Sequence, residues 1–384
     1  MNSRRRSLFV FLAAGASLTN ACLGAGYDVP DQSGRGMGMA DAFIAGATGA
    51  SAAYYNPAGL ADVQTLEFNG NLYLAHTEIE AEIDGGGTEE SDNDVYLSPN
   101  LFYAHRLSAH PNVVAGIGIY APYGQGLNWD EDDAPKTTAV FRSGRITFVN
   151  VNPSLAWGVN DAVSLGIGLD AAWSKAEVET GPVAGGLEGD GDSTALGWNA
   201  GMQVRMTPQW KLGLTYRSRL EMEYEGDIPA ALGDSIEMDY PRSAGAGLEY
   251  RRIPAVRLEV SAIWKEWSSV KSIRPGGDRW EDNWTFMVGG EYDVAPRWTL
   301  RAGYGLSQQP KPDTELTLNK DDSHAFAAGF SRRFGERWTL DGAALLALGE
   351  EKHVDRSGLP PAFAYEADYS SVGYSLAAGL RYAF

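Results

Sequence analysis

The chain offers few residues whose types and spacing suit catalysis or metal binding. Its five histidines are scattered at no spacing that a metal-ligand set requires, and Cys22 is its only cysteine. No nucleophile elbow, phosphate-binding loop or zinc motif occurs among the residues. The sequence therefore predicts a protein that is not an enzyme and that carries no cofactor and no metal.

Acidic side chains are the other chemical groups that gather along the chain. They form runs at residues 84–94, 129–133 and 187–192, and the formal net charge is −19. Such runs can hold Ca²⁺ or Mg²⁺, but none has the ligand spacing of a calcium loop. We interpret them as solvated loops that divalent ions could bridge to lipopolysaccharide phosphates, with a specific metal site as the alternative. The charge argues against nucleic acid as a partner.

The N-terminus reads as a secretory signal peptide at residues 1–24. Three arginines precede an apolar run of about a dozen residues, and small residues follow as far as Gly26. The run is too short to cross a bilayer as a helix, and no other stretch is long enough. Cys22 would leave with this peptide. Lipid attachment at Cys22 is the alternative, but the residues before it match a lipobox poorly.

Side chains alternate between apolar and polar along most of the chain after about residue 65, which is the period of a β-strand. Leu165, Ile167 and Leu169 share one face, for example, while Gly166 and Gly168 share the other. The polar face is rich in glycine, serine and charge, so it suits a lumen better than a packed core. About fourteen such segments can be counted, at residues 65–76, 94–106, 112–121, 145–157, 161–175, 194–206, 209–222, 236–250, 255–267, 283–292, 297–305, 323–334, 337–348 and 371–384.

The links between these segments alternate in length. Short links, such as 108–111, are separated by long ones, such as 122–144. Short periplasmic turns that alternate with long external loops are typical of outer-membrane barrels. The pattern predicts an all-β fold, a transmembrane, antiparallel up-and-down β-barrel of about fourteen strands that occupies residues 63–384.

Aromatic residues mark one rim of the predicted barrel. Trp210, Trp298 and Trp338 each follow a short link, as the tryptophans of an interfacial girdle do. The last segment alternates back from the terminal Phe384, which suits the closing strand of an outer-membrane barrel. We expect this strand to pair with the first one near residues 66–74.

Residues 25–62 do not alternate. They are rich in glycine and alanine, and they end in Asn-Pro-Ala-Gly-Leu at 56–60. Small residues let a backbone fold tightly in a confined space. We interpret this segment as an N-terminal hatch, a plug inside the barrel lumen, with a disordered periplasmic extension as the alternative.

Several short runs form an ordered set along the chain. The hatch holds Gly-Arg-Gly-Met-Gly-Met-Ala-Asp-Ala-Phe and Asn-Pro-Ala-Gly-Leu. Later runs are Ala-Pro-Tyr-Gly at 121–124, Asn-Pro-Ser at 152–154, Leu-Thr-Tyr-Arg-Ser at 214–218, Trp-Lys-Glu-Trp-Ser at 264–268 and Leu-Arg-Ala-Gly-Tyr at 300–304. Each run alone is a weak signal, but the ordered set closely resembles the FadL/TodX-type outer-membrane transporters. The similarity covers essentially the whole chain after the signal peptide.

The resemblance implies a transporter in the bacterial outer membrane that takes up hydrophobic small molecules by passive diffusion. The hatch would rearrange, and the ligand would leave sideways through the barrel wall at the third strand. Long-chain fatty acids are the expected ligands; aromatic or other neutral hydrocarbons are the alternative, and a general porin is a further one. Other expected partners are outer-membrane lipid, lipopolysaccharide and the barrel assembly machinery, whose recognition signal Phe384 fits. We expect a monomer.

The resemblance and the local residues together nominate three sets of site residues. The hatch contacts should involve Asn56, Pro57, Ala58 and Gly59. The lateral gate, a kink in the third strand, should involve Gly116, Gly118, Tyr120 and Pro122. The two glycines mark either a bend or room for the hatch. Apolar and aromatic side chains should line the pocket, for which the candidates are Phe43, Ile44, Tyr54, Tyr55, Tyr120 and Phe141.

A fatty acid also needs a cation for its carboxylate. By similarity to the fatty-acid transporters, Lys175 stands where a basic ligand-binding residue is expected, at the end of the fifth strand. Simple parity places Lys175 on the outward face with Trp173, so it would need a bulge or a position above the bilayer to serve. A second expected basic position is acidic here, at Glu281 or Asp282. Neutral ligands therefore compete with fatty acids as the expected substrate.

Overall fold

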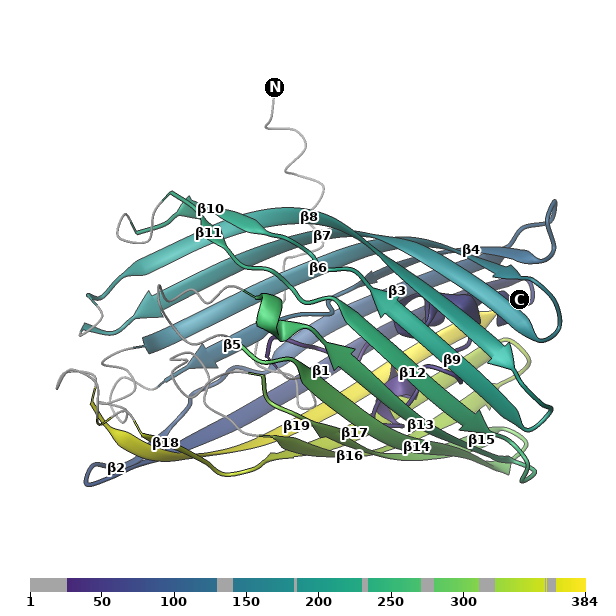
Figure 1. Cartoon of the computed structure of the whole chain (residues 1–384). Coiled ribbons are helices and arrows are strands. Elements are labelled where there is room, and N and C mark those ends of the chain that lie inside the picture. Colours follow the sequence, from purple (N-terminus) through teal and green to yellow (C-terminus); the bar gives the residue numbers. More distant parts are fainter. Residues whose placement is uncertain are drawn as a thin grey trace.

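The protein is a closed barrel around a folded N-terminal segment (Figure 1). The structure is a computed structural model and describes residues 26–129, 141–182, 185–229, 234–270, 280–310, 322–355, 357 and 364–384. The predicted signal peptide and most of the acidic run at 129–133 lie outside these residues.

Fourteen antiparallel strands make up the wall, as the sequence predicted. They are β1 (Leu66–Ile83), β3 (Tyr96–Arg106), β4 (Val113–Tyr120), β6 (Phe141–Gly158), β7 (Val163–Thr180), β8 (Glu188–Arg205), β9 (Trp210–Arg217), β12 (Ser243–Tyr250), β13 (Val256–Lys265), β14 (Asn283–Ala295), β15 (Trp298–Ser307), β16 (Ser323–Phe334), β17 (Trp338–Gly349) and β19 (Glu366–Ala383). Shorter strands extend neighbouring ladders, namely β2 (Gly87–Glu90), β5 (Gln125–Asn128), β10 (Glu223–Asp227), β11 (Ile236–Glu237) and β18 (Lys352–Asp355).

The seam between the first and last strands closes the wall. β1 pairs with β3 on one side and with β19 on the other, with Glu67 opposite Ala383 and Leu74 opposite Leu376. This register confirms the predicted pairing of the last segment with residues near 66–74. The faces also follow the predicted parity, because Leu376 is 58% exposed whereas Ser375 is buried.

Several strands are longer than predicted. β1, β6 and β8 each have 18 residues, whereas a tilted strand needs only about 9–11 to cross the hydrocarbon layer. The extra part of β1 carries acidic side chains on its outward face, at Glu78, Glu80 and Glu82. The apolar parity reverses there, because Ile79, Ala81 and Ile83 face inward, and this is why the prediction stopped at His76. None of the described helices is long and apolar enough to cross a membrane.

The N-terminal segment lies in the lumen and has little regular structure. Its helices are α2 (Gly34–Met37), α3 (Ala52–Tyr55) and the 3-10 helix η1 (Pro57–Asp62). Ser33 caps α2, because its hydroxyl accepts a hydrogen bond from the Gly36 amide at 3.1 Å. We call residues 26–62 of the structure the hatch.

Wall side chains bind the backbone of the hatch directly. The Glu259 carboxylate of β13 accepts hydrogen bonds from the amides of Ile44, Ala45 and Gly46 at 2.6–2.7 Å. The Gln203 amide of β8 donates to the carbonyls of Ala45 and Ala47, at 3.1 and 2.8 Å. Buried backbone groups without regular structure need such partners, so the polar lumen is what allows the hatch to fold there.

Two wall glycines leave room for the hatch backbone. A Cβ at Gly201 would lie 2.0 Å from the Asn56 side-chain oxygen, and a Cβ at Gly303 would lie 2.1 Å from the Met39 carbonyl carbon. Any larger residue would therefore overlap the hatch, and these close approaches fix its position against β8 and β15.

We expect Gly201→Ala to reduce the free energy of unfolding by about 1–3 kcal/mol, because the added methyl group overpacks the contact with Asn56. Urea titrations of the protein in lipid vesicles measure this change. Gly70→Ala is the matched control, because a Cβ at Gly70 meets its nearest atom, on Leu101, at 3.5 Å. Equal stability of the Gly201 variant and the native protein would contradict the close approach.

Candidate functional site

The hydrogen-bonded ladder of the wall is interrupted at the end of β4, which is the third wall strand in chain order. β4 ends at Tyr120 and β5 begins at Gln125, so residues 121–124 belong to neither strand. β3 pairs with β4 only between Leu101 and Arg106. In the described part of the chain, residues 96–100 of β3 form no ladder with β5, which pairs with β6. We call residues 121–124 the break.

The first residues of the hatch bind the backbone of the break. The Val29 amide donates to the Pro122 carbonyl, and the Gly124 amide donates to the Tyr27 carbonyl, both at 2.9 Å. Asp28 and Tyr123 thereby form an isolated antiparallel bridge. The hatch, rather than a neighbouring wall strand, satisfies the polar groups that the break exposes.

The predicted gate residues fall into two groups. Pro122 lies in the break and Tyr120 directly precedes it, but Gly116 and Gly118 lie inside the regular ladders of β4 with β3 and β6. The glycines therefore do not mark the interruption itself. A Cβ at Gly116 would lie 3.1 Å from the side chain of Leu60, which agrees with the interpretation that this glycine leaves room for the hatch.

The predicted hatch contacts gather at the start of η1. The Asn56 side-chain oxygen accepts from the Ala58 amide at 3.2 Å, and its side-chain NH₂ group lies within hydrogen-bond distance of the carbonyls of Ile44, Met202 and Leu214, at 3.0–3.2 Å. Pro57 is the first residue of η1. Asn56 thus links the hatch to both β8 and β9. Gly59 serves internal packing, because a Cβ there would lie 2.2 Å from the Ala47 carbonyl oxygen.

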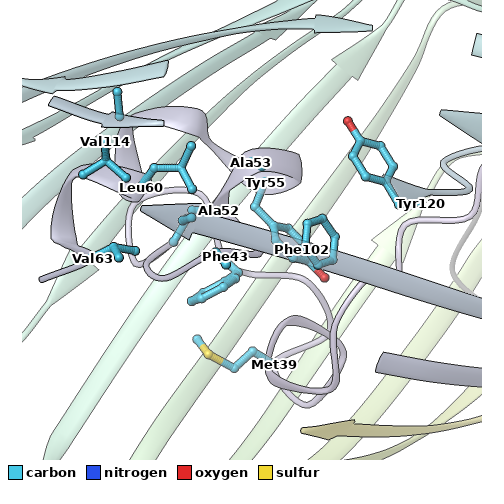
Figure 2. Close-up of a cluster of buried hydrophobic side chains, with 14 residues drawn as sticks. Met39, Phe43, Ala52, Ala53, Tyr55, Leu60, Val63, Phe102, Val114 and Tyr120 are labelled. Atoms are coloured by element: carbon cyan, nitrogen blue, oxygen red, sulfur yellow. The ribbon is translucent and has the colours of Figure 1, made fainter. Parts of the chain in front are cut away.

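Most of the predicted pocket residues form the core of the hatch instead. Phe43 and Tyr55 pack at 5.2 Å between ring centroids, and Tyr54 packs on Tyr120 at the same distance. Figure 2 shows Phe43, Tyr55, Phe102 and Tyr120 among the small side chains of this core. A core of this kind joins the hatch to β3 and β4. Ile44 points to the wall near Gly245.

Phe141 lies in a different apolar cluster, with Trp129 and Tyr369. Its position at the start of β6 is far along that strand from Ala156, which packs on the hatch core. Phe141 and the hatch aromatics therefore do not line one common pocket.

A second cluster of aromatic side chains fills the lumen beside the break, and the sequence analysis missed it. Its rings are those of Tyr27, Tyr123, Phe148, Tyr224, Tyr240, Trp267 and Trp280, and we call it the aromatic cluster. Ring centroids lie 4.5 Å apart for Tyr123 and Tyr240, and 5.2 Å apart for Tyr27 and Trp280. Several of these residues sit in or beside long links, where alternation gives no signal. The Trp-Lys-Glu-Trp-Ser run was the available clue.

Three hydroxyl groups, hydrogen-bonded to one another, form a small polar site beside the rings of the aromatic cluster. The Tyr224 hydroxyl donates to the Ser174 hydroxyl at 2.7 Å and lies 2.9 Å from the Tyr240 hydroxyl. An apolar surface with a few convergent polar groups is what small-molecule sites in proteins present.

Two cations reach the lumen near this cluster. Arg217 pairs with Asp170 at 2.6 Å, donates to the Tyr120 hydroxyl at 3.1 Å and donates to the Tyr54 carbonyl at 3.4 Å. Lys265 pairs with Asp28 of the hatch. Each buried cation therefore has a carboxylate partner, as burial requires.

Lys175 lies on the outer face of the wall, as simple parity indicated. Its ammonium pairs with Glu177 at 2.7 Å and with Asp190 at 3.4 Å, while the neighbouring Ser174 points inward to the Tyr224 hydroxyl. The register of β7 has no bulge at this residue, so Lys175 could bind a ligand only from a position above the bilayer.

The hatch also contains a buried acid pair, Asp31 and Asp41. Burial raises the pKa of Asp31 to about 6, although the Tyr73 hydroxyl donates to its carboxylate at 3.2 Å, and burial together with the charge of Asp31 raises the pKa of Asp41. The folded state therefore holds a proton more tightly than the unfolded chain does. It follows that the hatch loses stability as the pH rises from the ordinary value of 3.8 towards 6.

The external ends of β6, β7 and β8 border a polar cleft of about 520 Å³. Six of its lining residues are acidic, namely Asp94, Glu177, Glu179, Glu188, Asp190 and Asp227. Such a lining does not suit an apolar ligand. Among the described residues, no group of three or more His, Cys, Asp or Glu side chains is arranged to hold a metal ion.

Known proteins with similar sequences transport lipids or lie in the outer membrane. The family model described as "Outer membrane protein transport protein (OMPP1/FadL/TodX)" matches residues 15–384. A long-chain fatty acid transport protein of Escherichia coli O6:H1 is 22% identical over 62% of this chain and 66% of its own length, slightly less than two thirds. Outer membrane protein P1 of Haemophilus influenzae is 22% identical over 90% of this chain and 89% of its own length.

Solved structures share the fold. A FadL homologue of Pseudomonas aeruginosa superimposes with a TM-score of 0.78 at 20% identity, over 94% of this chain and 100% of its own. The toluene transporter TodX of Pseudomonas putida gives 0.68 at 16% identity, over 90% and 98%. This chain belongs to the OMPP1/FadL/TodX family of outer membrane transport proteins.

Proposed function

We propose that the protein takes up long-chain fatty acids by passive diffusion, with lateral exit through the break. The observation that carries this proposal is the interrupted ladder at residues 121–124, which is bound by the N-terminal end of the hatch rather than by the wall. The ligand enters from the long-link side, occupies the aromatic cluster, and leaves through the wall when the hatch releases the break.

Lateral exit suits an apolar ligand for a simple physical reason. Transfer of apolar surface into water is unfavourable by about 25 cal/mol per Å². A ligand that moves from the aromatic cluster into lipid never makes this transfer, whereas one that crosses a water-filled pore does. The rings of Tyr27 and Tyr123 belong to the aromatic cluster, and Tyr123 itself lies in the break, so apolar surface extends from the cluster to the opening.

Aromatic or other neutral hydrocarbons are the second candidate ligand class. The aromatic cluster has several rings and one small polar site, which would hold a neutral ring as well as a chain. A general porin is disfavoured, because the hatch core and its contacts with the wall fill the lumen. Outer-membrane lipid, lipopolysaccharide and the barrel assembly machinery remain the proposed partners, and a monomer the proposed state.

Deletion of residues 31–56 tests the plug. We expect the deleted protein to conduct ions steadily in planar bilayers and the native protein to conduct little, because the deletion removes α2, α3 and the loop that Glu259 binds. Heat-dependent mobility in gels serves as the control that the barrel still folds. Equal conductance of the two folded proteins would contradict the proposal.

A disulfide between Val29→Cys and Pro122→Cys tests the exit. The backbone groups of these residues are hydrogen-bonded at 2.9 Å, so the oxidised pair should lock the hatch onto the break. We expect oleate uptake by cells to fall at least about tenfold under oxidation and to recover with a reductant. Each single variant is the control. Undiminished uptake by the locked protein would exclude this exit.

Lys175→Ala tests whether the outer lysine binds the ligand. Because its ammonium is paired with Glu177 and Asp190 outside the wall, we expect less than about a twofold change in the oleate dissociation constant, well below what a lost charge-assisted hydrogen bond produces. Oleyl alcohol provides the neutral comparison. A selective loss of oleate binding would restore Lys175 to the ligand site.

A further inference from the structure

Lys265 is a lumenal cation whose partner lies on the hatch. It is the last residue of β13, and its inward side chain is 16% exposed. Its ammonium is paired with the carboxylate of Asp28, which is 5% exposed. Trp267 follows two residues later in the 3-10 helix η3 (Trp267–Ser269) and belongs to the aromatic cluster. The ion pair therefore stands at the edge of the proposed ligand site.

The same ion pair is tied to the contact that covers the break. Asp28 lies between Tyr27 and Val29, and these two residues exchange backbone hydrogen bonds with Gly124 and Pro122. The ring of Tyr27 packs on Trp267 at 5.9 Å and on Trp280 at 5.2 Å. Movement of Asp28 would consequently disturb both the cover of the break and the aromatic cluster.

Arg217 shows why Lys265 is distinct. The carboxylate that holds Arg217 belongs to Asp170 of the wall strand β7, which does not move with the hatch. The carboxylate that holds Lys265 belongs to the end of the hatch. A buried ammonium that loses its carboxylate is strongly destabilised, so Asp28 can leave Lys265 at low cost only when another anion takes its place.

We propose that Asp28 occupies the position of a ligand carboxylate, and that a carboxylate ligand displaces it from Lys265 and thereby frees residues 27–29 from the break. This inference rests on the proposed function and identifies its ligand class as amphiphiles with a carboxylate head group. The ligand's chain would lie among the rings of the aromatic cluster. Its carboxylate would pair with Lys265 in place of the Asp28 carboxylate. A neutral ligand can fill the cluster but cannot compete for Lys265.

The exchange makes opposite demands on the two partners. Asp28 competes with the ligand, so its removal strengthens carboxylate binding; Lys265 binds the ligand, so its removal weakens it. Binding and hatch release are coupled reciprocally. A purely structural ion pair would instead make both variants less stable without any preference between carboxylate and neutral ligands.

The experiment measures two quantities in detergent-purified protein. The first is the dissociation constant of oleate and of oleyl alcohol, which differ in the head group. The second is the rate at which maleimide modifies Val29→Cys, a position that is 1% exposed in the native structure. Both are measured on four backgrounds: native, Asp28→Asn, Lys265→Met and Lys265→Arg. Arg145→Met is the matched control, because it removes one positive charge whose side chain is 40% exposed.

We expect oleate to accelerate modification of the native background at least about tenfold and oleyl alcohol to leave it unchanged. Asp28→Asn should bind oleate about tenfold more tightly, with rapid modification in the absence of ligand. Lys265→Met should lose the preference for oleate over oleyl alcohol, and Lys265→Arg should keep it. Arg145→Met should behave as the native protein does.

Two different results would overturn the inference. In the first, oleate and oleyl alcohol both bind the native protein, but each variant, Asp28→Asn or Lys265→Met, changes the affinity for oleate as much as the affinity for oleyl alcohol, or both variants change the affinity for oleate in the same direction. This result excludes the exchange while the uptake function stands. If neither ligand binds the native protein, the uptake function fails and the exchange fails with it.

Discussion

Backbone amides and carbonyls inside a hydrocarbon layer must be hydrogen-bonded within the protein, and this constraint governs the molecule. A closed ladder meets it almost everywhere, and the β1–β19 seam removes the last free edge. In the part of the wall that the structure describes, the break interrupts the ladder and leaves polar groups that it does not pair. There the polar groups of Pro122 and Gly124 are bound by Val29 and Tyr27 instead. An opening in the wall is tolerable only because it has an internal cover.

The same constraint explains why the lumen is polar although the proposed ligand is largely apolar. The hatch has three short helices and long irregular stretches, whose backbone groups need partners. Glu259, Gln203 and Asn56 provide them. Two apolar clusters lie on the long-link side of the hatch core, the aromatic cluster and the cluster of Phe141, Trp129 and Tyr369. The division separates the residues that hold the plug from those that would hold the cargo.

Alternation revealed the wall because it reports directly which face of a strand meets lipid. It located β16 to the residue, and it failed along β1 where charged side chains replaced apolar ones beyond His76. The hatch was recognisable from its small residues, but its contacts were not. In the sequence, Glu259 is one lumenal acidic residue among several, and only the structure shows that it binds the amides of Ile44 and its neighbours. The aromatic cluster combines residues from links that are distant in the sequence, and no local sequence pattern indicates such a contact.

The two ends of the hatch differ in how they are held. Only three residues separate Asp62, the end of η1, from Leu66, the start of β1. The length of this connection is therefore limited to about 10 Å. The Arg106 guanidinium donates to the carbonyls of Ala61 and Val63 and so binds this part of the chain to β3. The hatch is therefore tied to the wall through the chain at its C-terminal end, whereas Tyr27 at its other end is held to the wall by noncovalent contacts. Release of the contacts at Tyr27 alone would uncover the break while the rest of the hatch still blocks the barrel's axial passage.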